Sequence, residues 1–319
     1  MRVLPSGGRM WVYVFVGLFL VFLPVFAGDA EISFGIDFMI LALAAMALNI
    51  IVGQTGLTSF GHAAFYGVGA YSLILLISKV GIPFWLAIII SPFICAVLGA
   101  IIGRICLQLV SFYFALLTLA FAELIYIIIH RWYSLTGGDR GLATERIPDI
   151  ISTPVPYYYL TLFLVTISII TIGFILNSAF GQSIQSVREN RLRAEFVGVN
   201  VKLNLLIAFV ISSFFTGLAG ALYAGNAHTA FPNYAGFMMS GQLLICVLLG
   251  GMFYFEGPIV GAFVYVILQT YLIPITEYWP FVFGILIVVI VLLMPGGITS
   301  FIRSKFLLFH AKKEKILNT

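Results

Sequence analysis

The sequence predicts an all-α, polytopic integral membrane protein with about 8–10 transmembrane helices and one helix outside the bilayer. Three observations carry this prediction: the composition, the length of the apolar runs, and one polar, basic stretch that interrupts them. Of the 319 residues, 62% are hydrophobic and 9% are charged, and the mean hydropathy is +1.13. Soluble domains are about 45–50% apolar and about 25% charged, so a water-soluble fold is excluded.

Ten apolar runs approach the roughly 20 residues that a spanning helix requires. We expect spans at about residues 10–27, 36–53, 62–78, 84–103, 109–130, 157–177, 203–224, 237–254, 257–275 and 279–294. Several runs are short or interrupted, so eight spans with additional re-entrant segments are an alternative. The first run is longer than the apolar core of a secretory signal, and we interpret it as a retained span. Residues 1–319 then form a single transmembrane domain.

The placement of Lys and Arg predicts the orientation of these spans. With the N-terminus in the cytoplasm, ten spans leave 12 of the 16 basic residues on the cytoplasmic side. These are Arg2, Arg9, Arg104, Arg188, Arg191, Arg193, Lys202, Arg303, Lys305, Lys312, Lys313 and Lys315, whereas Lys79, Arg131, Arg140 and Arg146 lie outside. Cytoplasmic loops carry an excess of Lys and Arg, so we expect both termini in the cytoplasm, with a basic tail at about residues 300–319. The net charge of +4 is spread over segment ends, which argues against a nucleic-acid partner.

Two stretches interrupt the apolar pattern with glycine and polar residues, at residues 49–69 (NIIVGQTGLTSFGHAAFYGVG) and 250–262 (GGMFYFEGPIVGA). Each lies on the expected cytoplasmic side between two spans, one in each half of the chain. Paired glycine interruptions in corresponding places indicate an internal repeat and the substrate path of a transporter. Glycines that simply allow close helix packing are the alternative interpretation.

Few residues are candidates for chemistry. Glu123 is the one acid well inside an expected span, where a carboxylate is costly and functional by default, although a hydrogen bond to a neighbouring helix is an equal alternative. For His62, which follows the first interruption, a packing or helix-terminal role is favoured over substrate contact. No pair of histidines has metal-ligand spacing, so no metal site is expected. The loop Leu135–Leu142 lacks the G-x-x-x-x-G-K-[ST] pattern of a phosphate-binding loop, as does the rest of the chain. Any ATP must therefore be hydrolysed by another subunit.

The long polar stretch between apolar runs is residues 178–202, in which four basic residues outnumber two acidic ones. Ser178 or Ser183 can cap the start of a helix here, and Gly198 can end it. An apolar minority that includes Val187 and Phe196 predicts an amphipathic helix parallel to the membrane. Such a helix can anchor to anionic membrane lipid or present a surface to a cytoplasmic protein. Its length, its glycine stop and its mixed charge favour the protein partner.

Six segments of the chain resemble one family in the same order. They are Asn49–Tyr71, Thr118–Glu123 with the later SLTGGDRGL loop, Gly181–Gly198, Ala208–Ala224, Leu249–Ala262 and Met294–Ile298. Together they resemble the LivM-type permease subunits of bacterial ABC importers for branched-chain amino acids. The SLTGG loop and the MPGGI ending are closer to LivM-type than to LivH-type chains.

The resemblance implies a transport subunit of the bacterial inner membrane, with no catalytic residue and no bound cofactor of its own. The implied partners are a LivH-type sister permease, two ABC ATPase subunits that use ATP, and a periplasmic substrate-binding protein. The substrate is then leucine, isoleucine or valine, moved by alternating access. Related permeases import urea or short amides, which is the alternative substrate class. An intramembrane enzyme and a passive channel are competing functions, but no set of acid, base and nucleophile converges at one depth.

The resemblance also implies roles for individual residues. The segment Ser183–Gly198 becomes the coupling helix that sits in a groove of one ATPase subunit, with contacts expected from Ser183, Val187, Arg188, Glu189, Arg191 and Gly198. The polar break between Gln54 and His62 is placed near the translocation path. The polar groups expected to meet the substrate are those of Gln54, Thr55, Ser59, His62 and Glu123.

Overall fold

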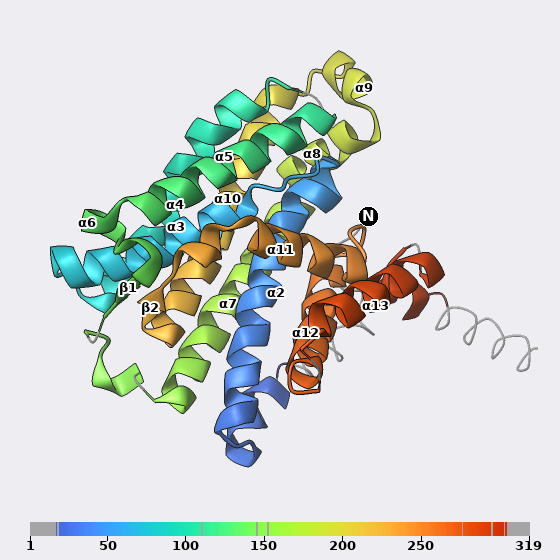
Figure 1. The fold of residues 1–319 in the computed structure, drawn as a ribbon. Helices are drawn as coiled ribbons and strands as arrows, with labels where there is room; N and C mark the ends of the chain where they lie inside the picture. The colour runs from blue at the N-terminus through green and yellow to red at the C-terminus, as the bar shows by residue number, and fades with distance from the viewer. Residues whose placement is uncertain are drawn as a thin grey trace, which may run out of the picture.

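The structure is a computed structural model that describes residues 17, 19–109, 111–144, 146–151, 153–275, 277–294, 296–302 and 304. The described chain is almost entirely helical, as predicted (Figure 1). The larger helices are α2 (Asp29–Thr55), α3 (His62–Leu75) with its π-helical extension η1 (Leu76–Val80), α4 (Phe84–Cys106), α5 (Ser111–Arg131), α7 (Pro154–Asn177), α10 (Val201–Ala227), α11 (Phe237–Gly250), α12 (Gly257–Leu272) and α13 (Trp279–Leu293). The smaller elements are α6 (Tyr133–Thr136), η2 (Gly138–Arg140), β1 (Leu142–Ala143), η3 (Asp149–Ile151), α8 (Ala179–Glu189), α9 (Arg191–Phe196), β2 (Thr229–Ala230) and η4 (Pro232–Ala235).

Six of the described helices are long and apolar enough to cross a membrane: α2, α3 with η1, α4, α5, α7 and α10. The last three expected spans are also helices, but α11, α12 and α13 have only 14, 16 and 15 residues. At 1.5 Å per residue they reach about 21–24 Å, short of the roughly 30 Å apolar core of a bilayer. Of the first expected span, 10–27, residues 17 and 19–27 are described, and 17 and 19–26 of them are helical. Most of the basic tail lies outside the described residues.

Helices α2 and α10 form the centre of the bundle. In the most apolar part of α2, 89% of the residues are buried inside the protein, against 33% for α5 and α7. A helix that is apolar all round can be enclosed by protein, as α2 is, or can face lipid, as much of α5 and α7 does. Small residues let the central helices approach one another, because a Cβ at Gly220 of α10 would collide with the main-chain carbonyl of Tyr66 in α3. This packing through small residues is typical of membrane helices.

The chain contains two similar helix–break–helix units. Helix α2 has 27 residues, ends at Gly56 in the left-handed conformation (φ 77°), and is followed after a break by the 14-residue α3. Helix α10 also has 27 residues, ends at His228 in the left-handed conformation (φ 57°), and is followed after a break by the 14-residue α11. The counterpart of the first glycine interruption is therefore the link 228–236. The predicted counterpart, residues 250–262, instead comprises the end of α11, the tight turn 251–256 and the start of α12, where Gly250 lies against Gly257.

The helices that follow the two breaks meet inside the bundle. The main-chain N–H of Ala63, at the start of α3, donates to Ser240 Oγ near the start of α11 (3.1 Å). His62 Nε2 lies 2.7 Å from Ser212 Oγ, and Ser212 is twelfth in the 27 residues of α10. Because α3 begins beside the middle of α10, the segment 56–61 re-enters the bundle instead of passing along its surface.

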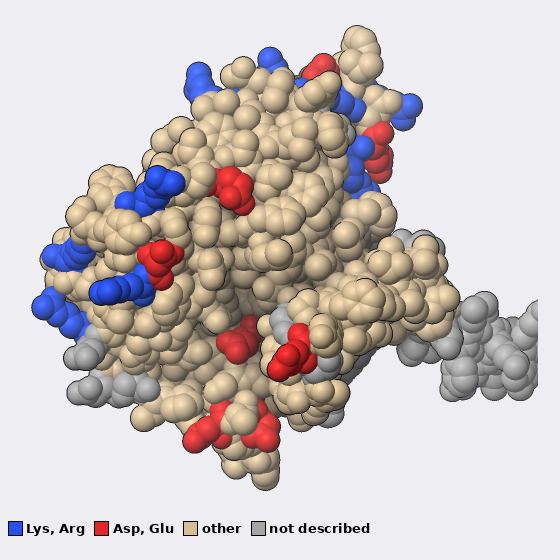
Figure 2. Space-filling model, in the orientation of Figure 1, with Lys and Arg blue, Asp and Glu red and all other residues tan. Residues whose placement is uncertain are grey.

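The polar elements lie at two ends of the bundle. At one end, α8 and α9 connect α7 to α10; at the other, β1 pairs antiparallel with β2 through Leu142↔Ala230 and Ala143↔Thr229. Figure 2 shows Lys and Arg side chains gathered towards these two ends, with a largely uncharged surface between them. This distribution is that of a protein whose middle lies in lipid.

Candidate functional site

The end of α2 next to α8 carries the first polar residues of the expected path. The side chains of Gln54 and Thr55 are 5% and 4% exposed. Thr55 Oγ1 donates to the Ile51 carbonyl (2.7 Å), and Gln185 Nε2 of α8 donates to Gln54 Oε1 (3.1 Å). The structure therefore joins Gln54 to the polar segment that follows α7, across 131 positions of sequence.

The re-entrant segment is held by a buried hydrogen-bond network around His62. Ser59 and His62 are each 1% exposed, and Ser59 Oγ lies 2.9 Å from His62 Nδ1. Ser212 Oγ lies 2.7 Å from His62 Nε2 and also donates to the Ala47 carbonyl. On the other side, Thr118 Oγ1 of α5 accepts from the main-chain N–H of Phe60 (3.3 Å). Both ring nitrogens of His62 are thus paired, which supports the packing role, and contact of Ser59 or His62 with substrate stays a prediction.

Glu123 lies apart from this network, half-buried on α5. It follows Leu116 by seven residues and precedes Ile127 by four, so the three share one face of the helix. That face is turned outward, because Leu116 is 48% and Ile127 is 51% exposed. Among the described residues no hydrogen bond or ion pair is recorded for Glu123. A carboxylate on an outward, otherwise apolar face of a membrane helix requires a polar neighbour or a water-filled space.

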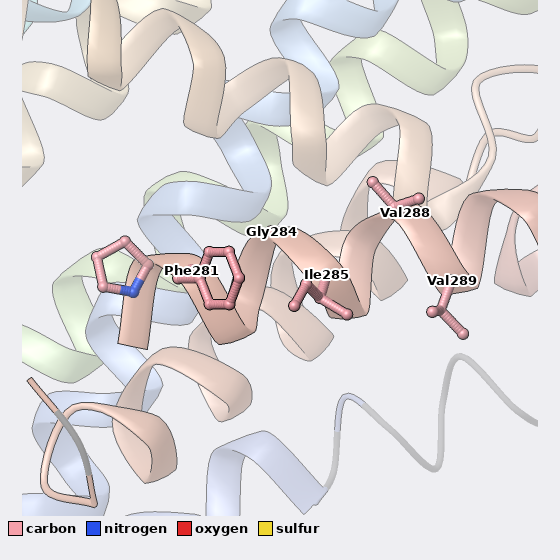
Figure 3. Close-up of a pocket in the computed structure, with 6 residues that line it drawn as sticks. Phe281, Gly284, Ile285, Val288 and Val289 are labelled. Carbon is pink, nitrogen blue, oxygen red and sulfur yellow. The ribbon is translucent and has the colours of Figure 1, made fainter. Parts of the chain in front are cut away.

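Helix α13 also presents an apolar outward face. A shallow depression of about 400 Å³ is lined by residues of α13: Pro280, Phe281, Gly284, Ile285, Val288 and Val289. Figure 3 shows their side chains along this single helix. Phe281 is 70% exposed and Val288 is 57% exposed. Because this wall is one helix, it is a surface for lipid or another membrane chain and not an enclosed ligand pocket.

The expected coupling helix is two helices. Ser178 Oγ accepts from the Gly181 N–H (3.4 Å) and caps α8, and Asn190 Oδ1 accepts from the Arg193 N–H (2.9 Å) and caps α9. The prediction of one helix over 183–198 is wrong, because Asn190 is extended (φ −161°) and separates the two. Its side chain offers the backbone an alternative to continued helix. Gly198 follows α9 with φ 91° and ends the segment, as expected.

The two helices turn their apolar residues in opposite directions. In α8, Ile184 and Val187 are 0% and 6% exposed and pack into the bundle. In and after α9, Leu192, Phe196 and Val197 are 67%, 91% and 80% exposed. The apolar surface available to another molecule is therefore that of α9.

The charged and hydroxyl residues predicted for coupling are Ser183, Arg188, Glu189 and Arg191, and Arg188 differs from the other three. Ser183 Oγ donates to the Ala179 carbonyl within α8 (2.9 Å). Glu189 is exposed, and Arg191 Nε lies 3.7 Å from Glu195 Oε1 along α9. Arg188 is the exception, because its side chain contacts parts of the bundle outside α8 and α9.

Arg188 joins α8 to both halves of the bundle. Its guanidinium donates to the Gly53 carbonyl at the end of α2 and lies over the ring of Phe253, in the turn between α11 and α12, at 5.1 Å from the centroid. A Cβ at Gly56 would lie 2.9 Å from Arg188 Cγ, so glycine leaves room for this approach. The two glycine-rich stretches picked out from the sequence therefore meet at one arginine of α8.

A second acid inside a spanning helix was missed by the sequence analysis. Asp37 is the ninth residue of α2 and the only charged residue between Ile32 and Thr55. The expected span began at residue 36, which placed Asp37 at its edge. Its interruption of an apolar run was the available signal, but the true start of the helix is Asp29.

Comparison with known proteins identifies the family. The family described as branched-chain amino acid transport system / permease component matches residues 32–291. The chain belongs to this family. This permease is 28% identical, over 83% of its own length and 69% of the relative's, to the high-affinity branched-chain amino acid transport system permease protein LivM of Escherichia coli (strain K12). It is 27% identical to LivM of Salmonella typhimurium, over 88% and 72% of the two chains. With LivH of Escherichia coli (strain K12) it is 26% identical over 81% and 90%. No solved structure matches the permease.

Proposed function

We propose that this permease is the transmembrane subunit of an ABC importer that moves leucine, isoleucine and valine across a bacterial inner membrane. In this proposal both termini lie in the cytoplasm, separate ATPase subunits hydrolyse ATP, and the permease binds no cofactor. The observation that carries the proposal is the contact of Arg188 with Gly53 and Phe253, because it connects a helix outside the bundle to both halves of the bundle.

Helix α9 is the proposed docking surface for an ATPase subunit. Leu192, Phe196 and Val197 form a small apolar patch on and directly after a short helix whose other residues are charged, apart from the buried Ala194. Exposed apolar patches rimmed by polar residues mark interaction sites. A displacement of α9 is passed to α8 across Asn190, and from α8 to α2 and the α11–α12 turn through Arg188.

The outward faces of α5 and α13 are the proposed contact surfaces for a sister permease. Both are apolar, and Glu123 lies on the α5 face, where a passage shared by two permease subunits supplies the polar surroundings that a carboxylate needs. A loaded binding protein docks on the segment 131–156 at the opposite end from α8. ATP-driven movement of the two ATPase subunits then opens the passage alternately to each side of the membrane.

The test is leucine uptake by proteoliposomes that contain the permease, a sister permease, the ATPase subunits and a loaded binding protein. Uptake that requires both ATP and the ATPase subunits supports the proposal. Uptake that continues without ATPase subunits identifies a passive channel, and the appearance of a chemically altered substrate identifies an enzyme. Competition by unlabelled valine, urea and acetamide separates the amino acids from the alternative class of urea and short amides.

A further inference from the structure

Asp37 places a carboxylate about 12 Å along α2 from the start of that helix, at 1.5 Å per residue. Its side chain is exposed in the isolated chain, while Ile36 and Met39 beside it are 1% and 3% exposed. Of the ion pairs recorded among the described residues, neither includes Asp37. A charged group without a counter-charge inside a spanning helix marks a substrate or ion pathway by default.

Three tyrosines from three other elements lie within electrostatic range of this carboxylate. Tyr66 comes from α3, Tyr223 from α10 and Tyr234 from η4, and all three interact electrostatically with Asp37. The ring centroids of Tyr66 and Tyr223 are 5.9 Å apart, those of Tyr223 and Tyr234 are 5.1 Å apart, and those of Tyr66 and Tyr234 are 6.5 Å apart. We name Asp37, Tyr66, Tyr223 and Tyr234 the Asp37–tyrosine cluster.

One further observation is an unsatisfied polar group next to the cluster. The hydroxyl of Tyr71, which interacts with Tyr234, is buried and has no hydrogen-bond partner among the described residues. Neutral aromatic faces and a carboxylate are the groups that attract an organic cation.

The cluster is also formed by the parts of the chain that the two breaks bring together. Tyr66 is the fifth residue of α3, after the first break, and Tyr234 lies within the second break. Tyr223 and Asp37 belong to the two long helices that precede those breaks. Movement of α2 relative to α10 therefore changes the spacing of the cluster.

We propose that the Asp37–tyrosine cluster binds the ammonium group of an amino-acid substrate on its way through the permease. The carboxylate of Asp37 pairs with the ammonium, and the tyrosine rings contribute cation–π contacts on the sides that the carboxylate leaves open. This inference rests on the proposed import function and specifies its chemistry, because a site of this kind accepts a zwitterion and does not favour urea or a neutral amide.

The experiment uses the full importer in proteoliposomes, with saturating leucine-loaded binding protein, and measures leucine taken up per ATP hydrolysed. Asp37→Asn removes the charge and keeps the shape, and Glu31→Gln is the matched control, since Glu31 is exposed in the first turn of the same helix. Losing one charged hydrogen bond lowers binding by about tenfold or more. We therefore expect Asp37→Asn to lower leucine uptake per ATP about tenfold, with Glu31→Gln unchanged and Asp37→Glu partly active.

The outcomes separate the two proposals. If the unmodified importer takes up no leucine in response to ATP, the proposed function is wrong. If it does, but Asp37→Asn takes up leucine as well as the Glu31→Gln control, the ammonium site is wrong and the import function stands. Should Asp37→Asn fail to co-purify with its partner subunits, Tyr234→Leu in the link before α11 is measured instead, and undiminished uptake by that variant overturns the site.

Discussion

Replacing Arg188 by alanine removes both contacts that connect α8 to the two halves of the bundle. A hydrogen bond from a charged donor contributes about 1.5–3 kcal/mol, and a cation–π contact at a partly exposed site about 0.5–1 kcal/mol. Arg188 is half-buried, so when α8 undocks its guanidinium regains hydrogen bonds to water. We therefore take about 2 kcal/mol as the net loss of docking free energy in the alanine variant. That value changes the ratio of docked to undocked α8 by about thirtyfold.

Two measurements in the reconstituted importer detect the weaker docking of α8. Leucine uptake per ATP hydrolysed is expected to fall by about an order of magnitude, because the ATPase subunits then move a helix that no longer holds α2 and the α11–α12 turn. Hydrogen exchange of the amides in residues 179–189 is expected to accelerate, because a weakened contact lowers the free energy of local opening.

Arg104→Ala is the matched control. It makes the same substitution in the last turn of α4, where the Arg104 side chain is exposed, and it is expected to leave both readouts near those of the unmodified protein. Equal exchange and equal coupling in Arg188→Ala and Arg104→Ala would refute the idea that Arg188 transmits movement. Charge reversal is expected to separate the two neighbouring residues in the same measurements. Arg188→Glu breaks the contacts of α8 with the bundle, whereas Glu189→Arg changes only an exposed charge.

Three more outcomes are expected from contacts elsewhere in the permease. Phe196→Ser should lower recovery of the ATPase subunits in co-purification about tenfold or more, since burying a phenylalanine contributes about 1.5–3 kcal/mol; unchanged recovery would assign α9 to the lipid surface. Ser212→Ala leaves His62 Nε2 unpaired and should cost about 1–3 kcal/mol, seen as a lower melting temperature in detergent; an unchanged melting temperature would show that the network is dispensable. Gly220→Ala drives a methyl group into the Tyr66 carbonyl and should destabilise by about 1–3 kcal/mol, and full thermal stability of this variant would contradict the close approach of α3 and α10.

Much of the fold was predictable because lipid imposes local rules. A backbone in the apolar core of a bilayer must satisfy its own hydrogen bonds, so long apolar runs become helices, and α2, α4, α5, α7 and α10 lie where such runs occur. The polar segment after α7 was equally clear from its charge. Its division at Asn190 was missed, since an asparagine inside a helix-forming stretch has no distinctive pattern until its side chain is seen to cap α9.

The candidate site was predictable only in part. The glycine-rich stretches and the α8 segment were recognisable singly, but their meeting at Arg188 spans 135 positions between Gly53 and the arginine. The second break, at 228–236, carries fewer glycines than the stretch 250–262, and equal helix lengths in the structure were needed to locate it.

Composition and local pattern alone determined that this protein is a helical membrane protein with a polar segment outside the bundle and no nucleotide-binding sequence. Only the tertiary structure decided which side chains meet, as with His62 and Ser212, or Asp37 and the three tyrosines. The physical reason lies in the central helices. A helix that is apolar on every side has no preferred face in its sequence, so its neighbours are chosen by close packing of small residues and by long-range hydrogen bonds.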